Sequence, residues 1–281
     1  MPDGIGWTLM SRIENSISVL IDQEVQERFL AIVNDDNYQH LADTMKSFGK
    51  RAIVPAWLLI SRLAVSYAAP WLDRYERFAL QCDFSHISSV SIPITLSESV
   101  DEHAITFRAI HRTADGGRTM VGSVLAIQFL EREAAAGEVP PLAQRSGART
   151  MTLTDDQFSE FAGIFEATDS KLTRLLFLSA CATSLVLLSF KDPQNEFEEA
   201  VSTLKAQSGN TPFYRKINVK LDSGVSIDAG EFVFEYLGYF KKGKTTIYDF
   251  CVRNGSACLV RGLYELDFIS RAAVMRFADE L

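Results

Sequence analysis

The sequence is poor in the residues that build metal sites, disulfide frameworks and nucleic-acid-binding surfaces. It has four histidines and four cysteines, and Cys82, Cys181, Cys251 and Cys258 form no CxxC pair. This spacing predicts neither a zinc site nor a disulfide framework, and it favours free thiols in a reducing compartment. The formal net charge of −8 disfavours a nucleic-acid-binding protein, which needs a basic face to neutralise phosphates.

An apolar run of membrane-spanning length is also missing. The longest run, from Leu175 to Phe190, is shorter than the roughly 20 residues that a bilayer requires, and Arg174 and Lys191 flank it. We therefore expect a buried core helix there and no membrane association. The N-terminus has no charged-then-apolar signal pattern, so we expect a cytoplasmic protein.

What the sequence does contain is two halves with the same order of predicted elements. A segment rich in Ala, Gly, Pro and charge predicts a linker over residues 131–150, between domains over residues 1–130 and 151–281. In the first half a short strand is predicted over residues 14–21. Each half then has a short amphipathic helix, continues with a long apolar helix, and ends in strands of alternating polarity. Such strands predict antiparallel sheets with one covered face, and one long helix per half would fill the concave side of a sheet.

Local signals define several of these elements. In the first half, Asp22 is a predicted helix cap, Pro55 suits the first turn of the apolar helix, and Pro70 is expected to end that helix. Asp115-Gly116 and Asn254-Gly255 predict one hairpin in each half.

One segment occurs in the first half only. From Asp22 to Pro55 is 33 positions, whereas from Asp155 to Leu172, the matching stretch, is 17. The additional piece contains the polar sequence NDDNYQH, residues 34–40. Its acids and amides are also good turn and cap residues, so a solvated loop is one interpretation. Its absence from the second half indicates that the fold does not require it.

The segment and its surroundings resemble the MaoC-like hydratases and dehydratases of the hot-dog fold. That family has an acid, one variable residue, an Asn, two further residues and a His between a first helix and the sequence Ile/Val-x-Gly-Met of a central helix. Here Asp35, Asn37 and His40 have that spacing, and the chain from 53 to 61, IVPAWLLIS, lies where the central helix should begin. The resemblance covers residues 16–129 best, and the second half matches in the order of its elements.

The resemblance implies both a fold and an activity. The fold is α+β, a double hot-dog of two antiparallel sheets, each wrapped around a long central helix and packed as an internal pseudo-dimer. The activity is hydration of trans-2-enoyl thioesters, or dehydration of (R)-3-hydroxyacyl thioesters. Asp35 and His40 would act on one water, Asn37 would orient them, and the backbone amides of Ala56 and Trp57 would stabilise the thioester oxygen.

Three positions differ from the family pattern. Asn34 replaces a Gly before the acid, Tyr38 replaces a Pro after the Asn, and Ala56 replaces the Gly that donates its backbone amide at the helix N-terminus. Because of these differences, two other functions stay open. One is an acyl-thioesterase of the same fold, and the other is a non-catalytic protein that binds acyl chains or stabilises a partner subunit.

The implied ligands are acyl thioesters rather than a resident cofactor or metal. Coenzyme A, or the phosphopantetheine arm of an acyl carrier protein, would carry the acyl group. Lys46, Lys50 and Arg51 could contact its phosphates, although charged loops of this kind are more often simply solvated. The resemblance also leaves open a homodimer.

Overall fold

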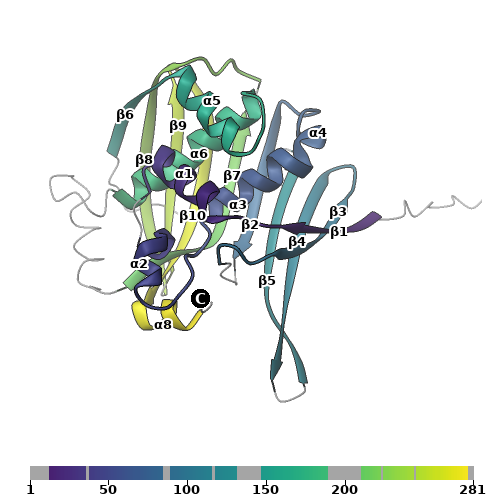
Figure 1. Cartoon of the computed structure of the whole chain (residues 1–281). Helices are drawn as coiled ribbons and strands as arrows, with labels where there is room; N and C mark the ends of the chain where they lie inside the picture. The colour runs from purple at the N-terminus through teal and green to yellow at the C-terminus, as the bar shows by residue number, and fades with distance from the viewer. Residues whose placement is uncertain are drawn as a thin grey trace, which may run out of the picture.

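The computed structural model of the chain shows helices gathered on one side of a large antiparallel sheet (Figure 1). It describes residues 13–35, 38–84, 89–115, 118–131, 147–188, 210–222, 224–243 and 245–277.

The first half contains five strands and the segments that lead into its central helix. In chain order these are β1 (Ile13–Val19), α1 (Gln23–Val33), the 3-10 turn η1 (Tyr38–His40), α2 (Ala42–Lys46), α3 (Ala56–Leu63), the π-helical segment η2 (Ala64–Ala68), α4 (Ala69–Leu72), β2 (Arg77–Phe84), β3 (Ile94–Val100), β4 (Ala104–Asp115) and β5 (Arg118–Glu131). Asp22 caps α1 as predicted, because its side chain accepts a hydrogen bond of 2.8 Å from the amide of Val25.

The second half repeats this order with a shorter lead into its central helix. Its elements are β6 (Gly147–Leu153), α5 (Asp155–Ile164), α6 (Lys171–Leu188), β7 (Asn210–Asp222), β8 (Gly230–Lys242), β9 (Thr245–Asn254), β10 (Ala257–Ser270) and α8 (Arg271–Phe277). A capping box between Thr154 and Gln157 starts α5. The predicted hairpins are confirmed by the pairing of β4 with β5 and of β9 with β10.

The predicted hot-dog fold is confirmed, but its two sheets form one continuous ten-stranded sheet. The strand order is β1-β3-β4-β5-β2-β7-β10-β9-β8-β6, so the second half repeats the first in mirror order about the β2–β7 joint. At that joint Arg77 pairs with Asp222 and Asp83 with Lys216, and both pairs also form ion pairs. The halves are therefore joined edge to edge by backbone hydrogen bonds.

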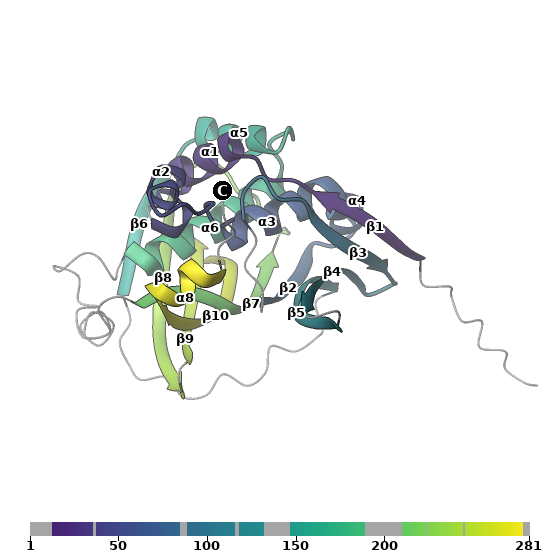
Figure 2. The same ribbon diagram turned by 60° about the horizontal axis from the view of Figure 1, so that its bottom comes forward.

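The central helices share one core on the helical side of the sheet (Figure 2). In α3, Leu58 and Ile60 are fully buried, as are Leu175 and Phe177 in α6. The outer helices α1 and α5 meet above them, where the rings of Phe29 and Phe161 lie 6.0 Å apart. This packing of related helices across the joint makes the two halves one hydrophobic unit.

Pro70 does not end the first central helix, contrary to the prediction. The helix widens into the π segment η2 and resumes as α4, in whose first turn Pro70 lies. A proline is tolerated there because a first-turn amide needs no intrahelical acceptor. The helix therefore continues to Leu72.

The predicted linker is too long at both ends. Glu131 ends β5, and residues 147–150 begin β6, an edge strand that pairs with β8; residues 132–146 lie outside the described residues. The side chains of residues 148–150 are exposed, so β6 has little of the apolar alternation that predicts a strand.

The C-terminal helix α8 was not predicted either. Its Val274 is fully buried in a small cluster with Met45, Ala52 and Ile53 of the first half. Across the described ranges, no helix combines the length and apolar character that crossing a membrane requires.

Candidate active site

The acid of the first-half segment follows directly on the end of α1. Asn34 has a left-handed backbone with φ of 55°, and the amides of Asn34 and Asp35 donate to the carbonyls of Ala31 and Leu30. Asn is the residue after Gly that best tolerates this conformation. The replacement of the family's Gly by Asn34 therefore preserves the turn that positions Asp35.

The histidine of the segment is held by a backbone carbonyl. Nδ1 of His40 lies 2.7 Å from the carbonyl oxygen of Ile53. Because a carbonyl only accepts, Nδ1 must carry a hydrogen, and in the neutral ring Nε2 keeps the free lone pair. Ile53 precedes the first helical residue of α3 by three positions, so this bond ties His40 to the approach to the central helix.

Asp35 and His40 are brought together. Oδ2 of Asp35 and Nε2 of His40 are 3.9 Å apart, with only 7% and 12% of their side chains exposed. The separation exceeds a direct hydrogen bond, but two polar atoms at this distance can both contact one water molecule. The arrangement can therefore hold and polarise a water between an acid and a base.

Gln26 supports this pair and was missed from the sequence. It is buried on α1, and its amide nitrogen donates to the carbonyl of His40 at 2.7 Å and to that of Ile53 at 3.3 Å. Gln26 lies on the same stripe of α1 as Phe29, Leu30 and Val33, all of them buried. A glutamine within an apolar stripe is the signal that could have identified it.

The N-terminus of α3 has no side-chain cap. Its N-cap residue is Pro55, whose carbonyl accepts from the amides of Leu58 and Leu59 at 3.1 and 3.2 Å. The amides of Ala56 and Trp57 donate to no acceptor in the described part of the chain. First-turn amides lie at the positive end of the helix dipole, so these two could stabilise a developing negative charge.

Of the other predicted site residues, the structure describes the three basic ones but not the asparagine. Asn37 lies outside the described residues. Lys46 is exposed at the end of α2, and Lys50 and Arg51 are half-buried in the stretch that leads to Pro55. These three lie on the chain between His40 and α3.

The second half reaches the same place through β7. Burial raises the pKa of Tyr214 above its usual value, and the negative charge of Asp35 raises it further. The Tyr214 ring packs edge-on against Tyr264 of β10 at 5.3 Å. Asp35 therefore lies within electrostatic reach of the second half.

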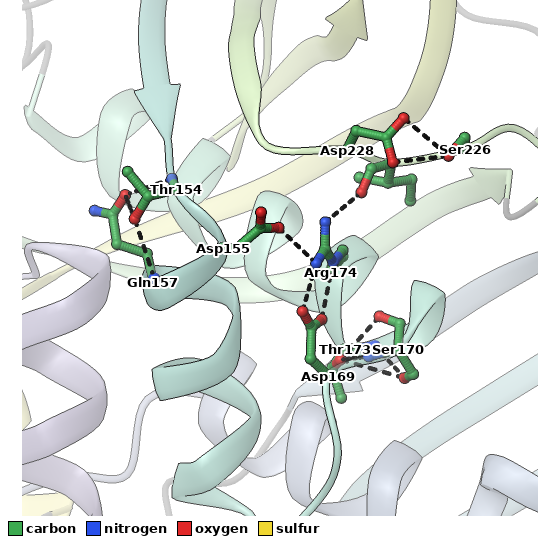
Figure 3. Close-up of polar contacts among 10 residues, drawn as sticks. Thr154, Asp155, Gln157, Asp169, Ser170, Thr173, Arg174, Ser226 and Asp228 are labelled. Atoms are coloured by element: carbon green, nitrogen blue, oxygen red, sulfur yellow. Dashed lines mark hydrogen bonds and ion pairs between the residues drawn. The ribbon is translucent and has the colours of Figure 1, made fainter.

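The N-terminus of the second central helix is closed (Figure 3). The Ser170 hydroxyl accepts from the amide of Thr173 at 3.2 Å, and the Thr173 hydroxyl accepts from the amide of Ser170 at 2.8 Å. Arg174 pairs with Asp155 and Asp169 and donates to the carbonyl of Ile227 at 2.6 Å. Its guanidinium also lies over the ring of Phe158, 4.5 Å from the centroid.

Comparison with known proteins identifies the fold. No protein-family model matches the chain, and no curated protein sequence matches it. Among solved structures, one described as a MaoC-like dehydratase aligns with a TM-score of 0.56 and 7% identity, over 91% of this chain and 98% of that one. An N-terminal dehydratase from the difficidin assembly line aligns with a TM-score of 0.52 and 12% identity, over 94% and 97%. The chain has the hot-dog fold of these dehydratases across nearly its whole length.

Proposed function

We propose that this chain catalyses the reversible hydration of trans-2-enoyl thioesters to (R)-3-hydroxyacyl thioesters. The observation that carries the proposal is the 3.9 Å approach of Asp35 and His40, whose imidazole is fixed to the carbonyl of Ile53 just before the uncapped N-terminus of α3. The (R) stereochemistry follows from the family resemblance.

The reaction needs a base for water, a proton for the carbon next to the carbonyl, and stabilisation of the enolate-like oxygen. Neutral His40 presents the lone pair of Nε2 and takes a proton from the water while Asp35 accepts the other hydrogen in a hydrogen bond. The water oxygen bonds to C3, and the proton held by the pair is delivered to C2. Dehydration uses the same groups in the reverse order.

The thioester oxygen would lie at the amides of Ala56 and Trp57. Ala56 still provides the backbone N–H that the family's Gly provides, and its methyl group narrows the space available to the acyl thioester. The exposed Lys46 and its half-buried neighbours Lys50 and Arg51 would contact the phosphates of coenzyme A or of a carrier protein's phosphopantetheine.

The test is incubation of the full chain with crotonyl-CoA. We expect loss of the enoyl absorbance without release of free thiol, and formation of (R)-3-hydroxybutyryl-CoA on a chiral column. Free thiol from either crotonyl-CoA or 3-hydroxybutyryl-CoA would instead assign hydrolysis, the thioesterase alternative. No turnover of a panel of enoyl thioesters from short to long chains would overturn the proposal in favour of a non-catalytic acyl-binding protein.

The phosphate contacts have a separate test. Replacing Lys46, Lys50 and Arg51 together by Glu should raise the KM for crotonyl-CoA at low salt, with kcat little changed, because these residues would contact only the carrier. An unchanged KM would remove them from the binding site while leaving the assignment of Asp35 and His40 intact.

A further inference from the structure

Two cysteine side chains meet on the face of the sheet that points away from the helices. Sγ of Cys251 on β9 and Sγ of Cys258 on β10 lie 3.1 Å apart, and both thiols are free. The neighbours Phe250 and Val252 belong to the core beneath the helices, so the intervening Cys251 points to the opposite face. The same alternation applies to Cys258, which lies between Ala257, packed against the core, and the core residue Leu259.

A bulge interrupts the strand pairing beside Cys258. Cys258 pairs with Arg253 and Val260 with Val252, so Leu259 is an additional residue in β10. Such a bulge bends its strand and redirects side chains. Cys258 pairs with Arg253, which lies two residues along β9 from Cys251, so the two cysteines are diagonal neighbours across the ladder.

The charges around the pair distinguish the two thiols. A hydrogen bond from Cys251 lowers the pKa of Cys258 below that of an ordinary thiol, and the nearby positive charges of Arg253 and Arg261 lower it further. Glu235, which lies opposite Cys251 on β8 and pairs with Arg253 at 2.6 Å, acts in the other direction. The same hydrogen bond, together with burial, raises the pKa of Cys251.

Exposure distinguishes them in the same sense. Cys258 is half-buried, whereas Cys251 is fully buried. Cys258 is therefore the thiol that a small oxidant can reach and the one that reacts as a thiolate. Cys82 and Cys181 are buried thiols whose pKa values are raised by burial, so they provide unreactive references within the same chain.

We propose that Cys251 and Cys258 are a peroxide-reactive dithiol that closes to a disulfide across β9 and β10. The Cys258 thiolate attacks one oxygen of hydrogen peroxide, the O–O bond breaks, and hydroxide leaves and is protonated to water. The resulting sulfenic acid is attacked by Cys251, which forms the S–S bond and, with the proton of its thiol, releases the hydroxyl as a second water. Both sulfurs are oxidised and one peroxide is reduced, and a small thiol reverses the step.

The distance to be closed is short. A disulfide has an S–S bond of about 2.05 Å, so the sulfurs need to approach by only about 1 Å. The bond would join two strands that are already paired, and it lies on the face opposite the central helices. We therefore expect oxidation to raise the melting temperature and to leave the positions of Asp35 and His40 unchanged.

Peptide mapping provides the test. The native chain is treated with a small excess of hydrogen peroxide, its remaining thiols are alkylated after denaturation, and it is digested with trypsin without reduction. Trypsin places the two cysteines in different peptides, Thr245–Arg253 and Asn254–Arg261. We expect a cross-linked pair whose mass is lower by two hydrogens than the sum of the two peptides, and alkylation of Cys82 and Cys181 only.

Two variants identify the roles of the sulfurs. In Cys251→Ser, Cys258 should still react and should be trapped by dimedone as a sulfenic acid. In Cys258→Ser, Cys251 should react with peroxide about tenfold or more slowly than Cys258 does in Cys251→Ser, because the remaining thiol is buried and protonated. In the unmodified chain, the alkylation rate of Cys258 should rise with pH around a midpoint below the value of about 8.5 for an ordinary cysteine.

Three outcomes would overturn the proposal. These are oxidation of Cys258 to the sulfinic acid with Cys251 still free, a cross-link between different chains, and equal rates of modification at all four cysteines. None of these results depends on turnover of a thioester, so the dithiol and the hydratase proposals stand or fall separately.

Discussion

The two halves have the same backbone conformation and spacing from the cap of the first helix to the left-handed residue that follows it. After that residue they differ. Asn34 lies twelve positions after the cap Asp22, and Glu166 lies twelve after the cap Thr154, both with a left-handed backbone. The next amide in each half donates to the carbonyl five residues earlier, at 3.0 and 3.1 Å. The residues that carry these amides are Asp35 in the first half and Ala167 in the second. The backbone position of the candidate acid therefore occurs in both halves, but only the first half has a carboxyl group there.

The paths from this position to the central helix also differ. The first half takes 21 positions from Asn34 to Pro55, whereas the second takes four from Glu166 to Ser170. The longer path contains His40, and the shorter one leads directly into a capping serine. The N-terminus of α3 therefore has no side-chain cap, whereas that of α6 is capped by Ser170.

The largest expected effect concerns the pair itself. Asp35→Asn and His40→Ala should each lower kcat/KM for crotonyl-CoA by roughly 10²–10⁴-fold, because each removes a positioned acid–base group. Asp43→Asn, an exposed acid on α2 in the same segment, is the matched control and should retain full activity. Ala167→Asp adds the acid to the second half without a histidine, and activity gained there would contradict the comparison.

A large effect on stability is expected at the N-terminus of α6, where Arg174 forms its contacts. Arg174 is 17% exposed and holds two carboxylates and a carbonyl, so Arg174→Met should lower the free energy of unfolding by about 2–4 kcal/mol. Urea denaturation measures this loss. Residual hydration activity should match the wild type at temperatures where the variant is folded. A loss of activity in folded protein would show that the N-terminus of α6 takes part in the reaction.

Removing the N-cap side chain of α6 and adding one to α3 tests the comparison of the two central helices most directly. Ser170→Ala removes the cap of α6 and should cost about 1 kcal/mol in unfolding free energy without changing kcat. Pro55→Ser places a hydroxyl at the N-cap, where it can accept from the amide of Trp57 or Leu58. If the Trp57 amide contacts the thioester oxygen, this variant should lower kcat by about tenfold or more. The readouts are urea denaturation and steady-state hydration kinetics. Full activity in Pro55→Ser would argue against a contact between the Trp57 amide and the reacting thioester.

The smallest expected effects concern the two left-handed residues. Glu166→Gly should stabilise the chain by up to about 1 kcal/mol, because Glu is strained where Gly is not. Asn34→Gly should change stability by less, since Asn already tolerates this backbone. Thermal melts of the two variants in parallel provide the measurement. A larger gain from Asn34→Gly would mean that Asn34, and not Glu166, is the more strained of the two residues.

The sequence predicted the elements whose signals are local. Asp22, Asn254 and Gly255 mark a helix start and a hairpin through their own chemistry, and both features are present. β6 was missed because an exposed edge strand needs little apolar alternation. The continuation of the helix past Pro70 was missed because the π segment before it leaves no pattern in the sequence.

For the candidate site, the family resemblance and the order of elements suggested the pair of Asp35 and His40, but the bonds that position it are not local. His40 is fixed by Ile53, 13 residues away, and Gln26 reaches the same carbonyl from 27 residues away. The closure of the second mouth depends on the contact of Arg174 with Ile227, 53 residues apart. Such contacts arise from packing, which a single sequence does not specify.

The presence of both halves in one chain allows this asymmetry. In a symmetric homodimer one gene encodes both protomers, so a substitution that closes one mouth closes its copy as well. Here the two copies are connected in one polypeptide, and each can change without the other. Separating them would leave a bare strand edge on each fragment, open to pairing with any other extended chain. The covalent connection thus permits the two halves to carry different residues at equivalent positions.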